Sequence, residues 1–372
     1  MKYSYNEFSV DVHCDDSAPL QWLTEFIVPA FESVQDVNSK FNVTLSLSPS
    51  IFERVARKGP SADNPNVNCF IMDGRFKQHR RWQADPGERR VFDEKLRVFY
   101  TLAVNKGEIA VVAERDGRGA RTGLMRTVRE LMIHHELGSG SLLVHGAAIA
   151  NGEHGIIFAG SKNSGKTTLT MQATASKTCR FIANDRVFIS NFSLKPQVRG
   201  VPTFTRIRPE TVELFPGLDP RIRDRKYQRD LTMNEAAELR QGQGAAFTGK
   251  WPPSLSPAQF CDLLGIESQA QVTCTTLVFP RFDSTRATNL LLPIEPAAAV
   301  HRLVEKGLLI PGNQRYRDSI FDAVFPPQPR GPSEESIRMA CLQLTETVQS
   351  FEYKTGAREM DDLSFLHAVT TA

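Results

Sequence analysis

Hydrophobic and polar residues alternate along several stretches of the first third of the chain. The alternation is clear in residues 41–48, 98–104 and 108–114, and it is typical of strands with one buried face. Between the last two stretches, Asn105 and Gly107 provide the turn residues of a β-hairpin. The pattern therefore predicts a mostly antiparallel sheet.

Residues 122–138 change to helical spacing. Apolar residues recur there every three or four positions, and Gly138 provides a stop signal. We expect His134 and His135 to lie at the helix surface and at the edge of the core, because no neighbouring residues complete a metal-ligand set. Residues 1–138 together predict a smaller N-terminal α+β domain whose role the sequence does not show.

A second α/β pattern begins at residue 139. Residues 142–160 predict a strand, an Asn-Gly turn and a second strand, and residues 166–175 predict a helix. Two strand-like halves follow over 179–190, and strand and helix signals alternate beyond residue 270. We expect residues 139–372 to form an α/β domain with a mixed sheet.

The loop between the second strand and the helix carries a motif with a chemical purpose. Gly160, four residues, and then Gly165, Lys166 and Thr167 fit the G-x-x-x-x-G-K-[ST] pattern of a phosphate-binding loop. At average residue usage such a match arises by chance roughly once in a hundred chains of this length. The strand before the loop and the helix after it are the context that the motif requires.

Each position of this loop has an expected function in binding ATP. Glycines let backbone N–H groups point at phosphate oxygens, Lys166 reaches the β- and γ-phosphates, and the Thr167 hydroxyl binds Mg²⁺. Asp185 ends an apolar stretch eighteen residues beyond Thr167, where a second Mg²⁺ ligand is expected, although an ordinary Asn-Asp turn explains it equally well. The predicted nucleotide-binding residues are Gly160, Ser161, Lys162, Asn163, Ser164, Gly165, Lys166, Thr167 and Thr168.

Composition excludes some classes of function. Lys and Arg total 45 and Asp and Glu total 42, so the net charge of +3 gives no general attraction to nucleic acid or to an anionic membrane. We find no apolar run long enough to span a membrane and no signal peptide, and therefore expect a cytoplasmic protein. The six cysteines form no C-x-x-C pair and are expected to be reduced, and the eight histidines show no zinc-site spacing.

Two segments after the motif have unusual compositions. Residues 194–230 contain a cationic run that is either a solvated face or a source of arginines for phosphate or an acidic partner. Residues 240–257 are rich in glycine and proline and are expected to form a mobile lid. The cationic residues are Arg206, Arg208, Arg221, Arg223, Arg225, Lys226 and Arg229.

The order of these motifs resembles one family. His145-Gly146, the loop at 160–167, "ANDRVFI" and "QVRGV" together resemble the catalytic domain of HPr kinase/phosphorylase, over residues 142 to about 215. The resemblance implies a phosphoenolpyruvate-carboxykinase-like P-loop fold that uses ATP and Mg²⁺ and assembles into a homo-oligomer. It also implies that His145 pairs with a catalytic carboxylate, that Thr167 and Asp185 hold the metal, and that Lys166 and Arg199 act on the phosphates.

The chain departs from the family pattern at two positions. Asn184 stands where the family has the first residue of an Asp-Asp pair, and Gln197 stands where the family has Glu. An amide cannot accept a proton at neutral pH, so the family's catalytic base is missing at its usual position. The proton of an acceptor hydroxyl then goes to Asp185, to His145 or to the phosphate.

Three functions remain open from the sequence. The leading hypothesis is an ATP-dependent kinase that phosphorylates a hydroxyl, most simply a serine or threonine of a small protein or peptide. A nucleotide-binding adaptor without transfer is the second. A small-molecule kinase, or a carboxykinase-like enzyme acting on an organic acid, is the third. The sequence does not identify the acceptor.

Overall fold

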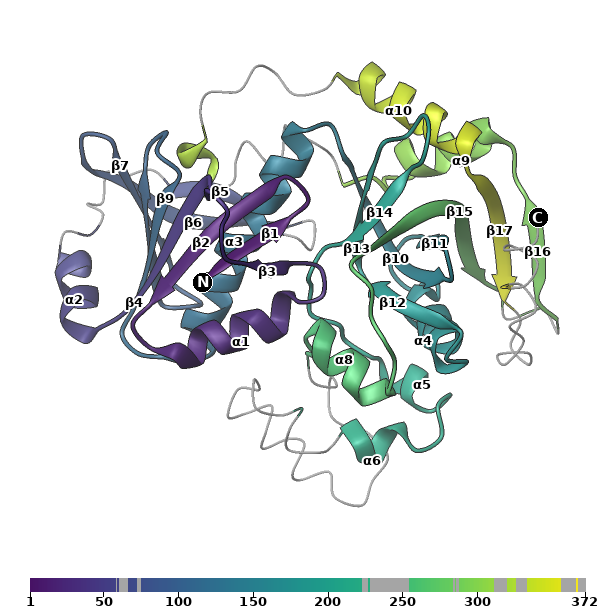
Figure 1. Cartoon of the computed structure of the whole chain (residues 1–372), viewed down its shortest axis with the longest axis horizontal. Helices are drawn as coiled ribbons and strands as arrows, with labels where there is room; N and C mark the ends of the chain where they lie inside the picture. The colour runs from purple at the N-terminus through teal and green to yellow at the C-terminus, as the bar shows by residue number, and fades with distance from the viewer. Residues whose placement is uncertain are drawn as a thin grey trace. The chain divides into compact units, whose positions relative to one another are not determined.

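The computed structural model describes residues 1–57, 59, 66–71, 75–222, 227, 254–283, 285, 288–310, 320–325, 333–355 and 366. Within these residues the protein is mixed α/β, with two multi-stranded sheets and nine α-helices (Figure 1). None of the helices in these residues is both long and apolar enough to cross a membrane.

The contacts between residues divide the chain into two compact units, and the main boundary between them lies between Ser139 and Gly140. The sequence predicted a boundary after residue 138. The first unit also takes in the later segment 311–332, of which residues 320–325 are described. This unit is therefore discontinuous in sequence, which the hydrophobic pattern did not indicate.

The first unit is built on a nine-stranded sheet in the order β3-β1-β2-β4-β9-β8-β7-β6-β5. Neighbouring strands are antiparallel except at β2–β4 and β4–β9, which are parallel. The predicted hairpin is confirmed, with Tyr100 opposite Val111. The strands are β1 (Lys2–Tyr5), β2 (Phe8–Cys14), β3 (Glu32–Val34), β4 (Phe41–Leu47), β5 (Asn66–Ile71), β6 (Arg75–Asp85), β7 (Glu88–Asp93), β8 (Val98–Ala103) and β9 (Glu108–Ala113).

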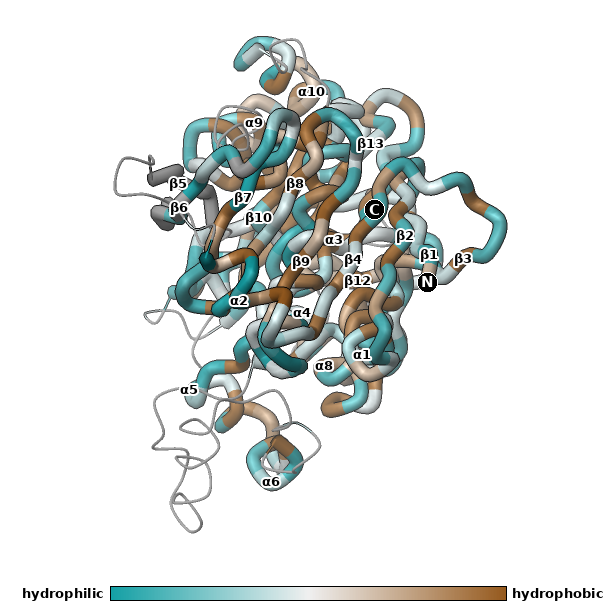
Figure 2. Tube along the Cα trace, turned by 90° about the vertical axis from the view of Figure 1, so that its left-hand side faces the viewer, coloured by the Kyte–Doolittle hydropathy of each residue, from teal (hydrophilic) through white to brown (hydrophobic). Residues whose placement is uncertain are grey.

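Side chains alternate between the two faces of this sheet. Helices α1 (Ser17–Ile27) and α3 (Arg118–Gly138) cover one face, and α3 begins four residues before the predicted 122. Helix α2 (Pro49–Arg57) packs with Phe99 and Val112 from the other face. The tube in Figure 2 shows the hydrophobic stretches along β4, β8 and β9. Burial on both faces explains why these strands contain long apolar runs.

The returning segment completes the core of the first unit. Phe321 is fully buried and meets Tyr100 edge-on at 5.4 Å between ring centroids. Phe325 stacks on His134 at 4.9 Å and contacts Phe41 at 5.1 Å. Burial lowers the pKa of His134 to about 4, so this ring is neutral at pH 7 and serves as a packing group.

The second unit is built on an eight-stranded sheet in the order β11-β10-β13-β14-β15-β17-β16, with β12 paired to β10. Strand β11 also pairs with β15 in parallel, so β10, β13, β14, β15 and β11 form a closed ring of pairings. The strands are β10 (Leu142–Asn151), β11 (His154–Ala159), β12 (Cys179–Ala183), β13 (Arg186–Ser190), β14 (Gln197–Gly200), β15 (Gln271–Phe282), β16 (Leu290–Pro293) and β17 (Gln349–Thr355).

Helices pack on both faces of this sheet. Ile156 and Phe158 of β11 pack with Leu169 of α4 on one face, and Ile157 of the same strand belongs to the core on the other face. Three short helices form a further core around Phe181 and Phe260. The helices are α4 (Lys166–Ala175), α5 (Pro209–Val212), α6 (Leu218–Ile222), α8 (Pro257–Leu264), α9 (Pro296–Val304) and α10 (Glu334–Thr347).

We predict that Phe321→Ala destabilises the first unit by about 3 kcal/mol, because it removes a fully buried aromatic side chain. Of the three tryptophans, Trp22 and Trp82 lie in the first unit, so a Trp251→Phe background makes fluorescence a probe of that unit. Urea unfolding followed by fluorescence measures the change. Phe282→Ala is the control, because Phe282 is 52% exposed and lies in the second unit. Equal midpoints for Phe321→Ala and its parent would contradict the prediction.

Candidate functional site

Three segments distant in sequence meet at the middle of β10. The Gly160 N–H donates to the His145 carbonyl over 3.4 Å, and the Gly146 N–H donates to the Asp185 carbonyl over 3.0 Å. Strand β11 thus delivers the loop to one edge of β10, and the turn between β12 and β13 reaches the other edge. Backbone pairing therefore brings together the predicted histidine, loop and carboxylate.

The glycine-rich loop, Gly160–Thr167, runs from the end of β11 into the start of α4. Gly165 has φ of 96°, in the left-handed region that favours glycine, and its carbonyl accepts the first helical hydrogen bond from Leu169 at 3.0 Å. A Cβ at Gly160 would lie 2.4 Å from Ser164 Oγ, so a larger residue there would have to displace the Ser164 side chain. Helix α4 begins directly after the loop, at Lys166.

Lys166 points back into this loop. Its side chain is buried, and Nζ donates to the carbonyls of Gly160 at 2.7 Å and Ser161 at 2.9 Å. His145 Nε2 lies 3.4 Å from the same nitrogen. Burial is the main cause that lowers the pKa of Lys166 to about 8, and Asp185 opposes this shift. These neighbours stabilise the charged ammonium less than water does, as the lowered pKa indicates. A phosphate bound beside Lys166 would stabilise that charge.

His145 joins Lys166 to Asp185. His145 Nδ1 lies 3.5 Å from Asp185 Oδ1, and Asp185 Oδ2 accepts from Arg186 Nε at 3.1 Å. Burial first, and then the charges of Lys166 and Arg186, lower the pKa of His145, while Asp185 acts in the opposite direction. The imidazole is consequently neutral at pH 7. With Nε2 facing an ammonium donor, the proton of the neutral ring belongs on Nδ1, toward Asp185.

The charges at this point favour an anion. Lys166 and Arg186 contribute two positive charges and Asp185 contributes one negative charge, which leaves a surplus of one positive charge beside the loop. Arg186 is only 4% exposed, so its charge is screened little by water. A surplus of this sign attracts anionic ligands.

Asn184 is buried beside Asp185, and its Oδ1 has no hydrogen-bond partner within the described residues. An unsatisfied buried acceptor costs on the order of 1–3 kcal/mol, which the fold must offset elsewhere. The amide at this position therefore leaves a buried acceptor next to Asp185.

The remaining predicted loop residues differ in exposure. Ser161, Lys162 and Asn163 are exposed, whereas Ser164, Thr167 and Thr168 are partly buried. Thr168 Oγ1 lies 3.3 Å from Thr211 Oγ1 of α5. Thr167 stands at the second position of α4, directly after Lys166.

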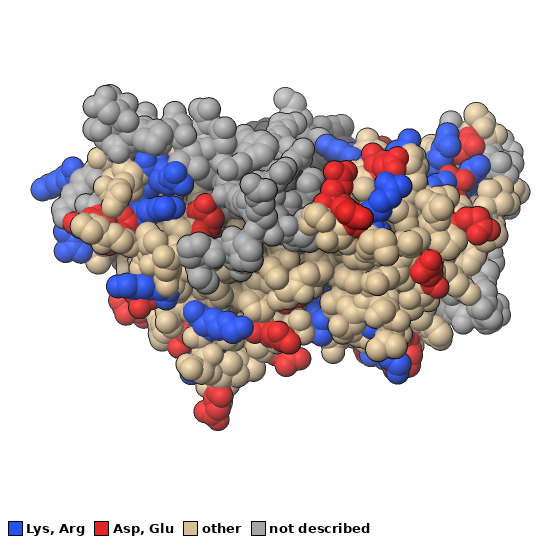
Figure 3. Space-filling view, turned by 90° about the horizontal axis from the view of Figure 1, so that it is seen from above, with Lys and Arg blue, Asp and Glu red and all other residues tan. Residues whose placement is uncertain are grey.

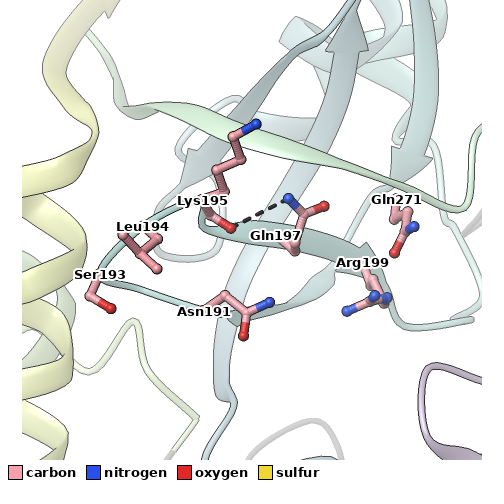
Figure 4. Close-up of a pocket in the computed structure, with 7 residues that line it drawn as sticks. All are labelled: Asn191, Ser193, Leu194, Lys195, Gln197, Arg199 and Gln271. Atoms are coloured by element: carbon pink, nitrogen blue, oxygen red, sulfur yellow. Dashed lines mark hydrogen bonds between the residues drawn. The ribbon is translucent and has the colours of Figure 1, made fainter.

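Arg199 lies elsewhere on the sheet. Its guanidinium is 3.5 Å from Ser190 Oγ, at the end of β13 opposite to Arg186, and Gln197 Nε2 donates to Thr273 Oγ1 at 3.1 Å. Figure 4 shows Arg199 beside Gln271 at the rim of a pocket of about 740 Å³. The pocket is lined by Asn191, Ser193, Leu194, Lys195, Gln197, Arg199 and Gln271, none of which belongs to the glycine-rich loop. The expected action of Arg199 on the phosphates stays a prediction, and its guanidinium lies by Ser190 and not at the glycine-rich loop.

Two arginines lie at the site without having been assigned to it from the sequence. Arg186 binds Asp185, and its position directly after the Asn-Asp pair is the signal that could have indicated it. Arg208, at the N-cap of α5, donates to Asn163 Oδ1 in the glycine-rich loop. Arg208 belonged to the cationic run, but spacing alone could not single it out.

Other members of that run make surface contacts or lie outside the described residues. Arg206 Nε donates to Ser254 Oγ at 3.0 Å, and Arg221 reaches the Asp262 carbonyl at 3.4 Å. Arg223, Arg225, Lys226 and Arg229 are outside the described residues, as is most of the predicted lid at 240–257. Lysine and arginine alternate with acidic residues over the described part of the face in Figure 3.

The residues present fit Mg·ATP, although they do not form a preformed metal cage. Within the described residues, no group of three His, Cys, Asp or Glu side chains could hold a metal ion. A magnesium nucleotide needs only one or two protein ligands, since its phosphates and water supply the others. The buried, partly solvated Lys166 and the positive surplus are the observations that support this fit.

The chain matches no protein-family model, and no curated protein is similar to it at a significant level.

We predict that ATP binding takes up protons at alkaline pH. Lys166, with its pKa near 8, is mostly neutral at pH 9, and an adjacent phosphate raises this pKa, so the bound ammonium gains a proton. Uptake should approach one proton per site at pH 9 and be small at pH 7, and affinity should fall as the pH rises through 8. Calorimetry in two buffers of different ionisation enthalpy measures the uptake.

Lys162→Met is the matched control, because Lys162 is an exposed lysine of the same loop. It should retain the alkaline uptake, whereas Lys166→Met should lose it. Uptake that does not change between pH 7 and pH 9 in the unsubstituted protein would show that Lys166 does not meet the phosphates.

Proposed function

We propose that this protein is an ATP-dependent kinase that transfers the γ-phosphoryl group to a hydroxyl. One observation carries the proposal: a buried lysine of a glycine-rich loop lies 3.4 Å from a histidine whose other nitrogen faces a carboxylate. This arrangement combines a phosphate-binding cation, a neutral base and a metal ligand. The resemblance to HPr kinase/phosphorylase agrees with it and suggests the same P-loop fold.

In the proposed complex, the loop N–H groups and Lys166 bind the β- and γ-phosphates. Lys166 exchanges its two carbonyl partners for phosphate oxygens, which removes the donor that faces His145 Nε2. Mg²⁺, held by Thr167 and Asp185, would neutralise phosphate charge. Nucleotide binding thereby frees the atom that the next step needs.

The proton of the acceptor hydroxyl goes to His145 Nε2. The acceptor oxygen forms a new bond to the γ-phosphorus while the bond to the bridging oxygen of ADP breaks, so ADP leaves with that electron pair. Asp185 stabilises the resulting imidazolium through Nδ1–H. Histidine thus replaces the carboxylate base that Asn184 cannot provide.

The acceptor class follows from the resemblance alone. A serine or threonine of a small protein or peptide is the proposed acceptor, with a small-molecule hydroxyl as the alternative. The resemblance also suggests a homo-oligomer. We further propose a cytoplasmic location, since ATP and Mg²⁺ are plentiful there.

A nucleotide-binding adaptor is the second candidate, and one observation favours it. Asn184 is buried beside Asp185, and an amide does not accept a proton at neutral pH, so this position provides no base. An adaptor would bind Mg·ATP without turnover under any condition. The same experiments decide between the two candidates.

Lys166→Ala and Thr167→Ala should each weaken Mg·ATP binding by tenfold or more, roughly 1.4 kcal/mol, because each removes a contact to the bound nucleotide. Calorimetry measures the affinity, and circular dichroism checks the fold. Lys162→Ala should bind like the unsubstituted protein. Unchanged affinity in Lys166→Ala would overturn the nucleotide assignment.

Turnover of variants at the base position tests the assignment of His145. We expect His145→Gln and Asp185→Asn each to lower ATP turnover on the order of a hundredfold, because they remove the base and its carboxylate partner. Because burial lowers the pKa of His145, the rate should fall only at a pH below the ordinary titration range of histidine, and this acid limb should vanish in His145→Gln. We expect Asn184→Asp to give no gain, since a new buried carboxylate would crowd Asp185 and the phosphates. A large gain in Asn184→Asp would show that a carboxylate base is required.

A further inference from the structure

We propose that Arg208, and not Arg199, provides the guanidinium that neutralises the transferring phosphoryl group. This inference rests on the proposed kinase function and names a residue of the same site. The juxtaposition that carries it is the contact between the Arg208 guanidinium and Asn163 Oδ1 of the glycine-rich loop.

The backbone around Arg208 is fixed by burial and hydrogen bonds. Ile207 is fully buried in the core that contains Met171 of α4. The Thr205 N–H and carbonyl pair with Leu255 at 2.8 and 2.9 Å. The Arg208 carbonyl accepts from two residues of the first turn of α5 at 2.9 Å. Only the partly exposed side chain of Arg208 is therefore free to change its partner.

The loop is contacted from two directions. Lys166 reaches its inner side and is buried, whereas Arg208 reaches Asn163 on its exposed side. The contact of Thr211 with Thr168 at 3.3 Å fixes α5 against the start of α4. A nucleotide held by this loop would lie between an inner ammonium and an outer guanidinium.

The charge on Arg208 is available to an anion. Its partner Asn163 is neutral, and within the described residues Arg208 forms no ion pair. Mg²⁺ and Lys166 together cannot balance four negative charges of ATP, and phosphoryl-transfer sites commonly add an arginine for the remainder. A guanidinium suits this function because its fork of donors spans two phosphate oxygens.

Arg199 occupies the position that the resemblance implies, but its geometry is less suitable. Its guanidinium lies by Ser190 and lines the pocket of Figure 4, whose residues include no member of the glycine-rich loop. Of these two arginines, only Arg208 touches that loop.

Three single variants separate the alternatives. Arg208→Gln removes the charge but retains a hydrogen-bond donor. Arg206→Gln is the matched control, because Arg206 lies two residues away and contacts Ser254 instead of the loop. Arg199→Gln tests the competing arginine. For each variant, calorimetry gives two affinities, one for Mg·ATP and one for ADP with Mg²⁺ and aluminium fluoride. Aluminium fluoride mimics the planar phosphoryl group in transfer. A coupled assay gives ATP turnover.

We expect Arg208→Gln to lower ATP turnover on the order of a hundredfold. Its affinity for ADP with Mg²⁺ and aluminium fluoride should fall by a similar factor relative to the unsubstituted protein. Its affinity for Mg·ATP should change little, and Arg206→Gln and Arg199→Gln should resemble the unsubstituted protein. The inference is overturned if Arg208→Gln retains the tight fluoroaluminate complex, if it weakens Mg·ATP to the same extent, or if only Arg199→Gln loses that complex. Failure of the unsubstituted protein to bind Mg·ATP would instead refute the proposed function itself.

Discussion

The candidate site depends on the two-sided pairing of β10. At His145 and Gly146 the strand is bonded to β11 on one edge and to the β12–β13 turn on the other, through backbone groups alone. These bonds do not depend on which side chains are present, so they fix the positions of the loop, the histidine and the carboxylate together. The side chains then determine only the chemistry. The backbone bonds at His145 and Gly146 would therefore be retained if the side chain at position 184 were changed.

Burial gives the site its electrostatic character. Lys166 and Arg186 are nearly shielded from water, whereas Asp185 retains 38% exposure of its side chain. The cations are thus screened less than the carboxylate, and the surplus positive charge acts at close range. The same burial disfavours protonation of His145, which keeps the ring neutral between two charged neighbours. Lys166 and His145 consequently have lowered pKa values for one common reason.

The sequence predicted most of what local patterns control. The hairpin at 98–113, the strands on either side of the Asn151-Gly152 turn, and helix α4 follow from period, turn residues and the loop motif, and the structure contains all of them. The proximity of His145 to Lys166 was implied only by resemblance. Arg208 could not be selected, because seven cationic residues shared its stretch and only tertiary packing of Ile207 directs this one at the loop. Arg199 was assigned to the phosphates only because its position matches a family motif. The side chains of β14 alternate between the two faces of the sheet, but this alternation does not show toward which end of the sheet the long Arg199 side chain extends.

The discontinuity of the first unit sets the order in which the protein can be built during synthesis. Tyr100 and Phe41 are translated early, but Phe321 and Phe325, which cover them, leave the ribosome only after the glycine-rich loop and most of the second sheet. An apolar surface on the first unit therefore stays uncovered for more than two hundred residues of elongation. The core of the first unit can therefore close only after synthesis has passed through most of the second unit.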